Sequence, residues 1–200
     1  MTPLALALLL HGCAPRVHPQ TLAAIVQVES GGWPWAIGDN TTRRSIDAPD
    51  YRTAVAVADS LIARGHNIDL GLGQVNSGNL RSLRLTPAEA LQPCTNLSAA
   101  AHILRGSYER AVAHFGSAFS ATHPNDVVLY AVSAYNTGSL FAGGRYVRKV
   151  VAAAFSRETE EVVEISRRIA DRPQAPAQVL VRFTSSPTLY EHGGSKRAGS

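Results

Sequence analysis

The chain has 200 residues, of which 45% are hydrophobic and 17% are charged, and its formal net charge is +4. These proportions are typical of one folded domain with a real core, and they exclude a disordered chain. The positive charge favours a polyanionic partner such as nucleic acid, acidic lipid or bacterial cell wall. Because the basic residues are scattered and not interleaved with aromatic ones, we predict no nucleic-acid partner.

The opening segment, MTPLALALLLHGC, is apolar, and no Lys or Arg precedes Arg16. This pattern matches a secretory signal poorly and is too short to cross a bilayer, so we expect no stable membrane span. We predict that residues 4–10 form the first core helix, within an apolar N-terminal segment of residues 1–15. The export route stays open.

A helix is predicted from Pro19 to the glycine pair at Gly31 and Gly32, because proline suits a first helical turn and glycine ends helices. Leu22, Ile25 and Val26 mark its buried stripe. The following polar segment, residues 38–53, has turn formers and no steady period, and indicates loop or short irregular strands.

Further elements follow from hydrophobic periodicity, capping residues and turn signals. We predict helices over residues 54–64, over one or two turns from Pro87, from residue 96 or 98 to 115, and over 124–135, 145–155 and 158–170, and a short strand over 68–72. The fold class is therefore mainly α (α+β), with a small β element. We divide the chain into the N-terminal segment, a main domain over 16–155, an amphipathic helix over 156–171 and a flexible tail over 172–200.

Glu29 falls on the apolar face of its helix, near the C-terminal end. Burial disfavours a charged carboxylate and the negative end of the helix dipole adds to the effect, so the pKa of Glu29 is expected to rise. A carboxyl that keeps its proton near neutral pH can act as a general acid. The alternative is a glutamate at the helix rim that reaches solvent.

Two other stretches carry groups suited to binding a sugar with N-acetyl substituents. GLGQVN, residues 71–76, offers paired glycines for close backbone approach, beside the amides of Gln74 and Asn76. AYNTG, residues 134–138, places Tyr135 and Asn136 at a helix end. Each stretch taken alone is also compatible with a tight turn that satisfies its own amides.

The stretches ESGG, GLGQVN and AYNTG, in this order, resemble the signature blocks of family-one lytic transglycosylases (SLT domains), which are similar to goose-type lysozyme. CAPRVHPQTLAAIVQVESG and PCTNLSAAAHIL resemble more specifically the transglycosylases of type IV secretion and conjugation systems. The resemblance covers roughly residues 12–150. Gly73 departs from it, because many relatives carry Met there, which would alter the packing of the sugar subsites.

The resemblance implies a periplasmic enzyme that binds peptidoglycan glycan strands, needs no cofactor or metal and serves a type IV secretion apparatus. Glu29 would protonate the oxygen between N-acetylmuramic acid and N-acetylglucosamine, and then act as base on the muramic C6 hydroxyl, leaving a 1,6-anhydro end. Ser30 would orient Glu29 beside the substrate. The positions implied for holding the glycan are Gln74, Asn76, Tyr135 and Asn136.

Two other functions remain compatible with the sequence. A muramidase that uses water needs a second carboxylate, and a set of loop residues interpreted as solvated or turn-forming offers candidates. This set is Asp39, Asp47, Asp50 and Asp69. The other alternative is a non-catalytic assembly protein that binds the wall.

The two cysteines, Cys13 and Cys94, are either buried free thiols or a disulfide, and a disulfide would require an oxidising compartment. Seven histidines lack the spacing of known metal motifs, so no metal site is predicted. We interpret His66, His102 and His114 as surface or core-edge residues.

Overall fold

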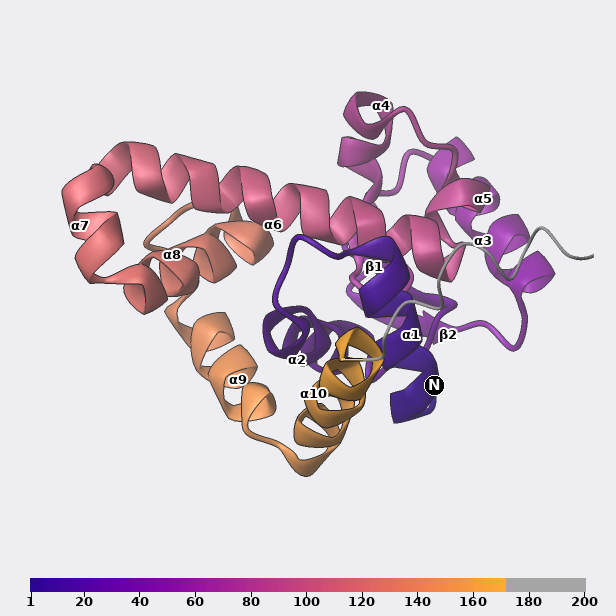
Figure 1. Cartoon of the computed structure of the whole chain (residues 1–200). Helices are drawn as coiled ribbons and strands as arrows, with labels where there is room; N and C mark the ends of the chain where they lie inside the picture. The colour runs from indigo at the N-terminus through magenta and orange to yellow at the C-terminus, as the bar shows by residue number, and fades with distance from the viewer. Residues whose placement is uncertain (172–200) are drawn as a thin grey trace, which may run out of the picture. The chain divides into compact units, whose positions relative to one another are not determined.

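The computed structural model describes residues 1–171, and the predicted tail over 172–200 lies outside them. The described part is mainly helical, with a small antiparallel sheet, which confirms the predicted fold class (Figure 1). The helices are α1 (Pro3–Cys13), α2 (Pro19–Ser30), α3 (Tyr51–Ala63), α4 (Leu80–Leu83), α5 (Pro87–Ala90), α6 (Pro93–Phe115), α7 (Ser117–Thr122), α8 (Pro124–Thr137), α9 (Gly144–Ala154) and α10 (Arg157–Ala170).

The sheet has the strand order β2-β1-β3-β4, with all neighbours antiparallel. Its strands are β1 (Ala36–Asp39), β2 (Arg44–Asp47), β3 (Ile68–Leu70) and β4 (Val75–Asn76), and a 3₁₀ turn, η1 (Ser77–Asn79), follows. Ile37 of β1 pairs with Leu70 of β3, and both are buried. The alternation of Ile68, Leu70 and Leu72 predicted β3, and all three side chains are fully buried.

Local sequence signals explain both ends of α2. Pro19 occupies the first turn, where the missing N–H costs nothing, and Gly31 ends the helix in the left-handed conformation at φ +57°. Leu22, Ile25 and Val26 are buried as predicted. Apolar residues of α8 and α9 pack against Ile25, so α2 runs through the core.

The long helix α6 is the central support of the fold and packs against α8 and α1 (Figure 1). Leu97, Ala100 and Leu104 are among its buried residues. The helix begins at Pro93, earlier than predicted, because proline fits a first helical position although it interrupts an apolar period. None of the helices in the described range combines the length and apolar character needed to cross a membrane.

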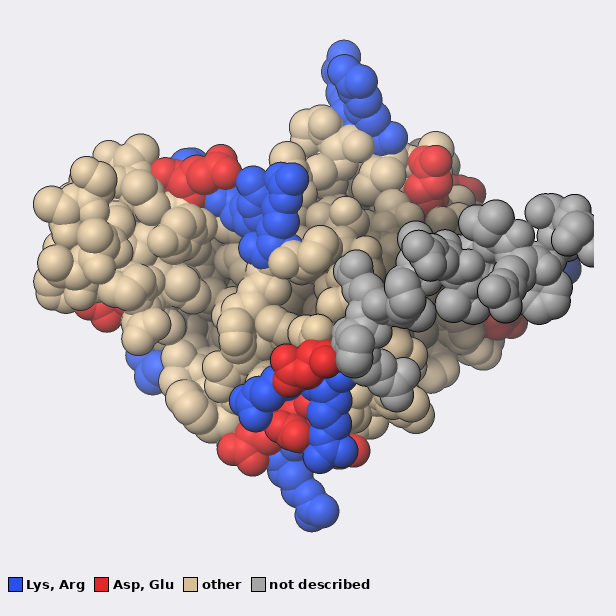
Figure 2. All heavy atoms as spheres, in the orientation of Figure 1, with Lys and Arg blue, Asp and Glu red and all other residues tan. Residues whose placement is uncertain are grey.

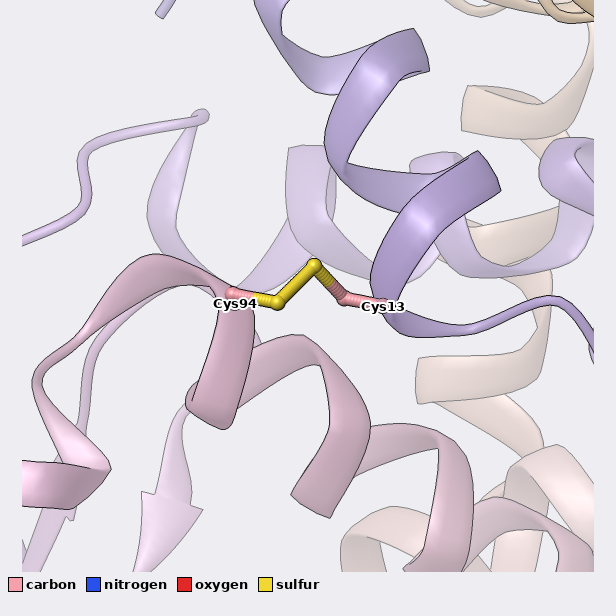
Figure 3. Close-up of a disulfide and its surroundings, with 2 residues drawn as sticks. All are labelled: Cys13 and Cys94. Carbon is pink, nitrogen blue, oxygen red and sulfur yellow. A yellow bond between two sulfur atoms is a disulfide. The ribbon is translucent and has the colours of Figure 1, made fainter. Parts of the chain in front are cut away.

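A disulfide joins the last residue of α1, Cys13, to the first turn of α6 at Cys94 (Figure 3). The S–S distance is 1.99 Å and the Cα–Cα distance is 5.3 Å. The bridge closes a loop with a sequence separation of 81. The helix α10 packs on α1 and α2, and residues 1–170 form one compact unit.

Candidate active site

A cleft of about 700 Å³ lies between the C-terminal end of α2, the sheet, α6 and the end of α8. Polar side chains dominate its walls, and the sequence brings them from well-separated segments. The wall residues used below are Glu29, Asn40, Asp69, Gln74, Asn76, Ile103, Ser107, Arg110, Tyr135, Asn136 and Gly138. The structure thus brings five of the six predicted site residues to one cleft, while Ser30 lies beside it.

Glu29 is the only predicted catalytic residue, and it is half-buried in the wall of the cleft. Burial raises its pKa from 4.5 to about 7. A hydrogen bond from the Tyr146 hydroxyl to Oε1, at 2.5 Å, partly opposes this rise. The negative charge of Asp69 raises the pKa further, and the positive charge of Lys149 lowers it. The net result is a carboxyl group that is still half protonated near neutral pH.

Two tyrosines flank the glutamate. Burial raises the pKa of Tyr146 and of Tyr135 above the usual value, so both hydroxyls keep their protons and act as donors. Tyr146 comes from α9 and donates to Glu29, whereas Tyr135, from α8, donates to the carbonyl oxygen of Gly73 at 2.6 Å. Tyr135 therefore ties one wall of the cleft to the turn that follows β3.

Ser30 holds the end of α2 in place and does not line the cleft. Its Oγ donates to the carbonyl oxygen of Leu72 at 2.8 Å and accepts a hydrogen bond from the N–H of Gly32 at 3.2 Å. These contacts fix the turn that carries Glu29 against the loop after β3. The structure gives Ser30 a positioning contact with the backbone, in line with the orienting role that the resemblance implies.

The turn after β3 is held from the other side by a buried amide on α6. Asn96 is fully buried; its Oδ1 accepts from the N–H of Gly73 at 2.8 Å. Its Nδ2 donates to the carbonyl oxygens of Leu70 and Ala90, both at 2.7 Å. Removal of this side chain would leave three buried backbone groups without partners, each at a cost of about 1–3 kcal/mol. Asn96 was not predicted as a site residue.

Gln74 reaches the cleft with part of its hydrogen-bonding capacity used, whereas both N–H groups of the Asn76 amide donate and its oxygen accepts two hydrogen bonds within the protein. The Nε2 of Gln74 donates to the carbonyl oxygens of Ala36 and Gly71, at 3.1 and 2.9 Å. Its Oε1 has no partner among the described residues and is free to accept from a ligand. The Nδ2 of Asn76 donates to Asn67 and to Asp69.

Asp69 is a wall residue of the cleft, which corrects its interpretation as a solvated or turn-forming residue. Its Oδ2 accepts from Asn40 and its Oδ1 from Asn76, both at 2.7 Å. The two amides hold the carboxylate on the side of the sheet, where its charge acts on Glu29. The sequence offered no signal for this placement, because it depends on the pairing of β3 with β1 and β4.

The other predicted loop carboxylates lie outside the cleft. Asp39 is buried rather than solvated; a hydrogen bond from the Thr42 hydroxyl is the main cause that lowers its pKa to about 2, and His66 contacts it at 2.9 Å. Asp50 caps α3 by accepting from the N–H of Thr53, and Asp47 ends β2 on the surface. Asn136 is exposed at the cleft, and its side chain makes no hydrogen bond with another described residue.

Gly73 is required by the close approach of α6. A Cβ at this position would lie 2.6 Å from the Cβ of Ala100 and 3.0 Å from the hydroxyl oxygen of Tyr135. Any side chain at residue 73 would therefore push α6 away from the turn. Glycine, in place of the Met that many relatives carry here, therefore allows the helix α6 to pack tightly on the loop.

Within residues 1–171, no group of three or more His, Cys, Asp or Glu side chains is arranged to hold a metal ion. His66 is half-buried against Asp39, whereas His102 and His114 are exposed.

Comparison with known proteins identifies the family. Residues 10–161 match the transglycosylase SLT domain. The chain belongs to the SLT domain family. This SLT domain is 44% identical over 145 residues to Protein virB1 of Agrobacterium fabrum, covering 71% of the chain and 56% of that protein. It is 38% identical over 175 residues to the type IV secretion system protein virB1 of Brucella suis, covering 84% of the chain and 70% of that protein.

The chain thus spans little more than half the length of the Agrobacterium relatives. No solved structure gave a significant match. The family match contains all three stretches, ESGG, GLGQVN and AYNTG, and this confirms the predicted resemblance.

Proposed function

We propose that this SLT domain is a peptidoglycan lytic transglycosylase that uses Glu29 as its only acid and base. The observation that supports this most directly is the position of Glu29, half-buried in the wall of an amide-lined cleft, where burial raises its pKa to about 7. A general acid works best when its pKa is near the working pH. The matched family supports the class of reaction.

The proposed reaction consumes no water. The carboxyl proton of Glu29 passes to the glycosidic oxygen as the bond from C1 of N-acetylmuramic acid to that oxygen breaks. The resulting carboxylate takes the proton of the C6 hydroxyl while O6 forms a bond to C1. Glu29 is then protonated again, and the products are an N-acetylglucosamine end and a 1,6-anhydro end.

A muramidase that uses water is the second candidate, and the position of Asp69 in the cleft favours it. An inverting glycosidase needs a second carboxylate about 6.5–9.5 Å from the acid to activate water. The masses of the products from purified sacculi decide between the two, because a hydrolysed end is heavier than a 1,6-anhydro end by one water. Hydrolysed ends alone would overturn the lytic mechanism.

We further propose that the protein acts in the periplasm, where it opens the wall for a type IV secretion apparatus. The name of the Brucella relative supports the secretion context. The disulfide between Cys13 and Cys94 supports an oxidising compartment. Direct contact with secretion-system subunits is part of the same proposal.

The pH dependence of kcat/KM should report the titration of Glu29. Because the acid must be protonated in the free enzyme, we expect kcat/KM to fall above about pH 7. Asp69→Asn removes a charge that raises the pKa of Glu29, so the fall should begin at lower pH. Tyr146→Phe removes a hydrogen bond that lowers this pKa, so the fall should begin at higher pH.

The measurement is turnover of purified glycan strands between about pH 5 and pH 9. Asp47→Asn is the matched control, because this surface carboxylate has no effect on Glu29 and should leave the profile in place. Shifts of Asp69→Asn and Tyr146→Phe in the same direction would contradict the assignment of Glu29 as the titrating acid.

A further inference from the structure

The face of α6 that lines the cleft continues past the cleft's end. Ile103, Ser107 and Arg110 are wall residues, and their spacing of four and three places them on one side of the helix. His114 follows four residues after Arg110 and continues the same face toward the C-terminal end of α6. A ligand lying along this face would reach His114 next.

An exposed aromatic side chain, that of Phe141, lies beside His114. The loop after α8 runs from the wall residue Gly138 to Phe141, and the ring of Phe141 lies edge-on to that of His114 at 5.3 Å. The Phe141 side chain is 61% exposed. Figure 1 shows this loop returning beside the C-terminal half of α6.

Phe141 is held in place by its neighbours although it is exposed. Its ring lies 5.5 Å from Tyr130 and 6.2 Å from Phe115, and Phe115 packs in turn on Phe119 at 5.1 Å. We call His114, Phe115, Phe119, Tyr130 and Phe141 the distal aromatic cluster. A ring fixed in this way loses little conformational freedom when a ligand covers it.

The chemistry around the distal aromatic cluster favours a neutral ligand over an anionic one. Within residues 111–144, Asp126 is the only Asp, Glu, Lys or Arg, and it lines the same hollow as Tyr130 and Phe141. On the face drawn in Figure 2, the surface over α7 is uncharged except for an acidic group at its lower edge. An anionic lipid or nucleic acid would find no cation on these segments, whereas the apolar C–H face of a sugar ring packs well on an exposed aromatic ring.

We propose that Phe141 is a distal glycan subsite, which holds a further N-acetylhexosamine of the strand whose scissile bond lies at Glu29. This inference rests on the proposed function, because it takes its ligand from the same glycan strand. Arg110, with Nη2 donating to the Ser107 hydroxyl at 3.1 Å, lies between the cleft and the subsite. The subsite would make the enzyme prefer long strands over short ones.

The test measures binding in the Glu29→Gln background, so that it does not depend on cleavage. The probes are N-acetylglucosamine oligomers from dimer to octamer. We expect the affinity to rise with length, and Phe141→Ala to weaken binding of the octamer about fivefold more than binding of the dimer. Phe141→Tyr keeps an aromatic ring and should restore the preference for the octamer.

Phe155→Ala is the matched control, because Phe155 is 71% exposed but lies far from Glu29. Its neighbour Ala154 accepts a hydrogen bond from Gln20 at the opposite end of α2.

Equal losses for dimer and octamer in Phe141→Ala, or no loss for either, would overturn the distal subsite. If wild-type protein binds oligomers in this way but releases no 1,6-anhydro ends, the proposed function fails and the subsite stands. Circular dichroism of each variant checks that the helices are intact.

Discussion

Glu29→Gln should abolish release of 1,6-anhydro ends from purified sacculi, with a fall in rate of about 10³-fold or more. The expected loss is large because one carboxyl group supplies both proton transfers, and each contributes about 10²–10⁴-fold in known enzymes. The amide keeps the size of the side chain and can still accept a hydrogen bond from Tyr146, so the cleft should keep its shape. The measurement is mass analysis of the soluble products.

The pH dependence of stability separates loss of chemistry from loss of fold. The pKa of Glu29 is about 7 in the folded protein and near 4.5 when unfolded, so the folded state binds more protons between these values. The wild type should therefore lose stability as pH rises through this window, because a buried carboxylate becomes charged. Glu29→Gln should not share this loss. A Glu29→Gln variant that still releases anhydro ends, or one that keeps the wild-type loss of stability over this pH window, would refute the assigned role.

Removal of the disulfide should lower the free energy of unfolding by about 2–5 kcal/mol. The bridge between Cys13 and Cys94 closes a long loop, with a sequence separation of 81, and so restricts the unfolded chain strongly. Chemical denaturation of the double variant Cys13→Ser, Cys94→Ser should show a lower midpoint than the wild type.

A reductant supplies the matched control for this second prediction. It should lower the midpoint of the wild type toward that of the double variant and leave the double variant unchanged. If the wild type has the same midpoint with and without reductant, the bridge contributes nothing to stability. The helix α1 would then be held by its packing on α10, α6 and α2.

The sequence predicts most of the helices correctly because their signals are local. Pro19 and Gly31 bound α2, and the buried stripe of this helix makes Glu29 conspicuous. The short elements α4 and α7 were not predicted, since a helix of one or two turns has too few residues to show a period. The same limit applies to β4.

The contacts within the candidate site are harder to predict from the sequence, because the side chains that make them come from distant segments and meet only after folding. Tyr146 acts on Glu29 from 117 residues away, and nothing near Tyr146 in the sequence indicates that α9 crosses the end of α2. Asn96 did carry a usable signal: like Glu29, it is a polar residue on the buried face of a helix. Assignment of glycan contacts to Gln74, Asn76, Tyr135 and Asn136 stays a prediction.

The contact between Gly73 and Ala100 limits the order in which mutations can accumulate along a lineage. Because a Cβ at residue 73 would meet the Ala100 methyl group at 2.6 Å, a larger residue on the loop is blocked while that methyl group remains. Ala100→Gly, occurring first, would remove the nearest obstacle at a cost in helix propensity of about 1 kcal/mol. The Tyr135 hydroxyl, 3.0 Å from the same point, would still have to shift. A Met at residue 73 therefore becomes accessible only after a change at Ala100 in the helix α6. If residue 73 changes first, the intermediate protein is less stable.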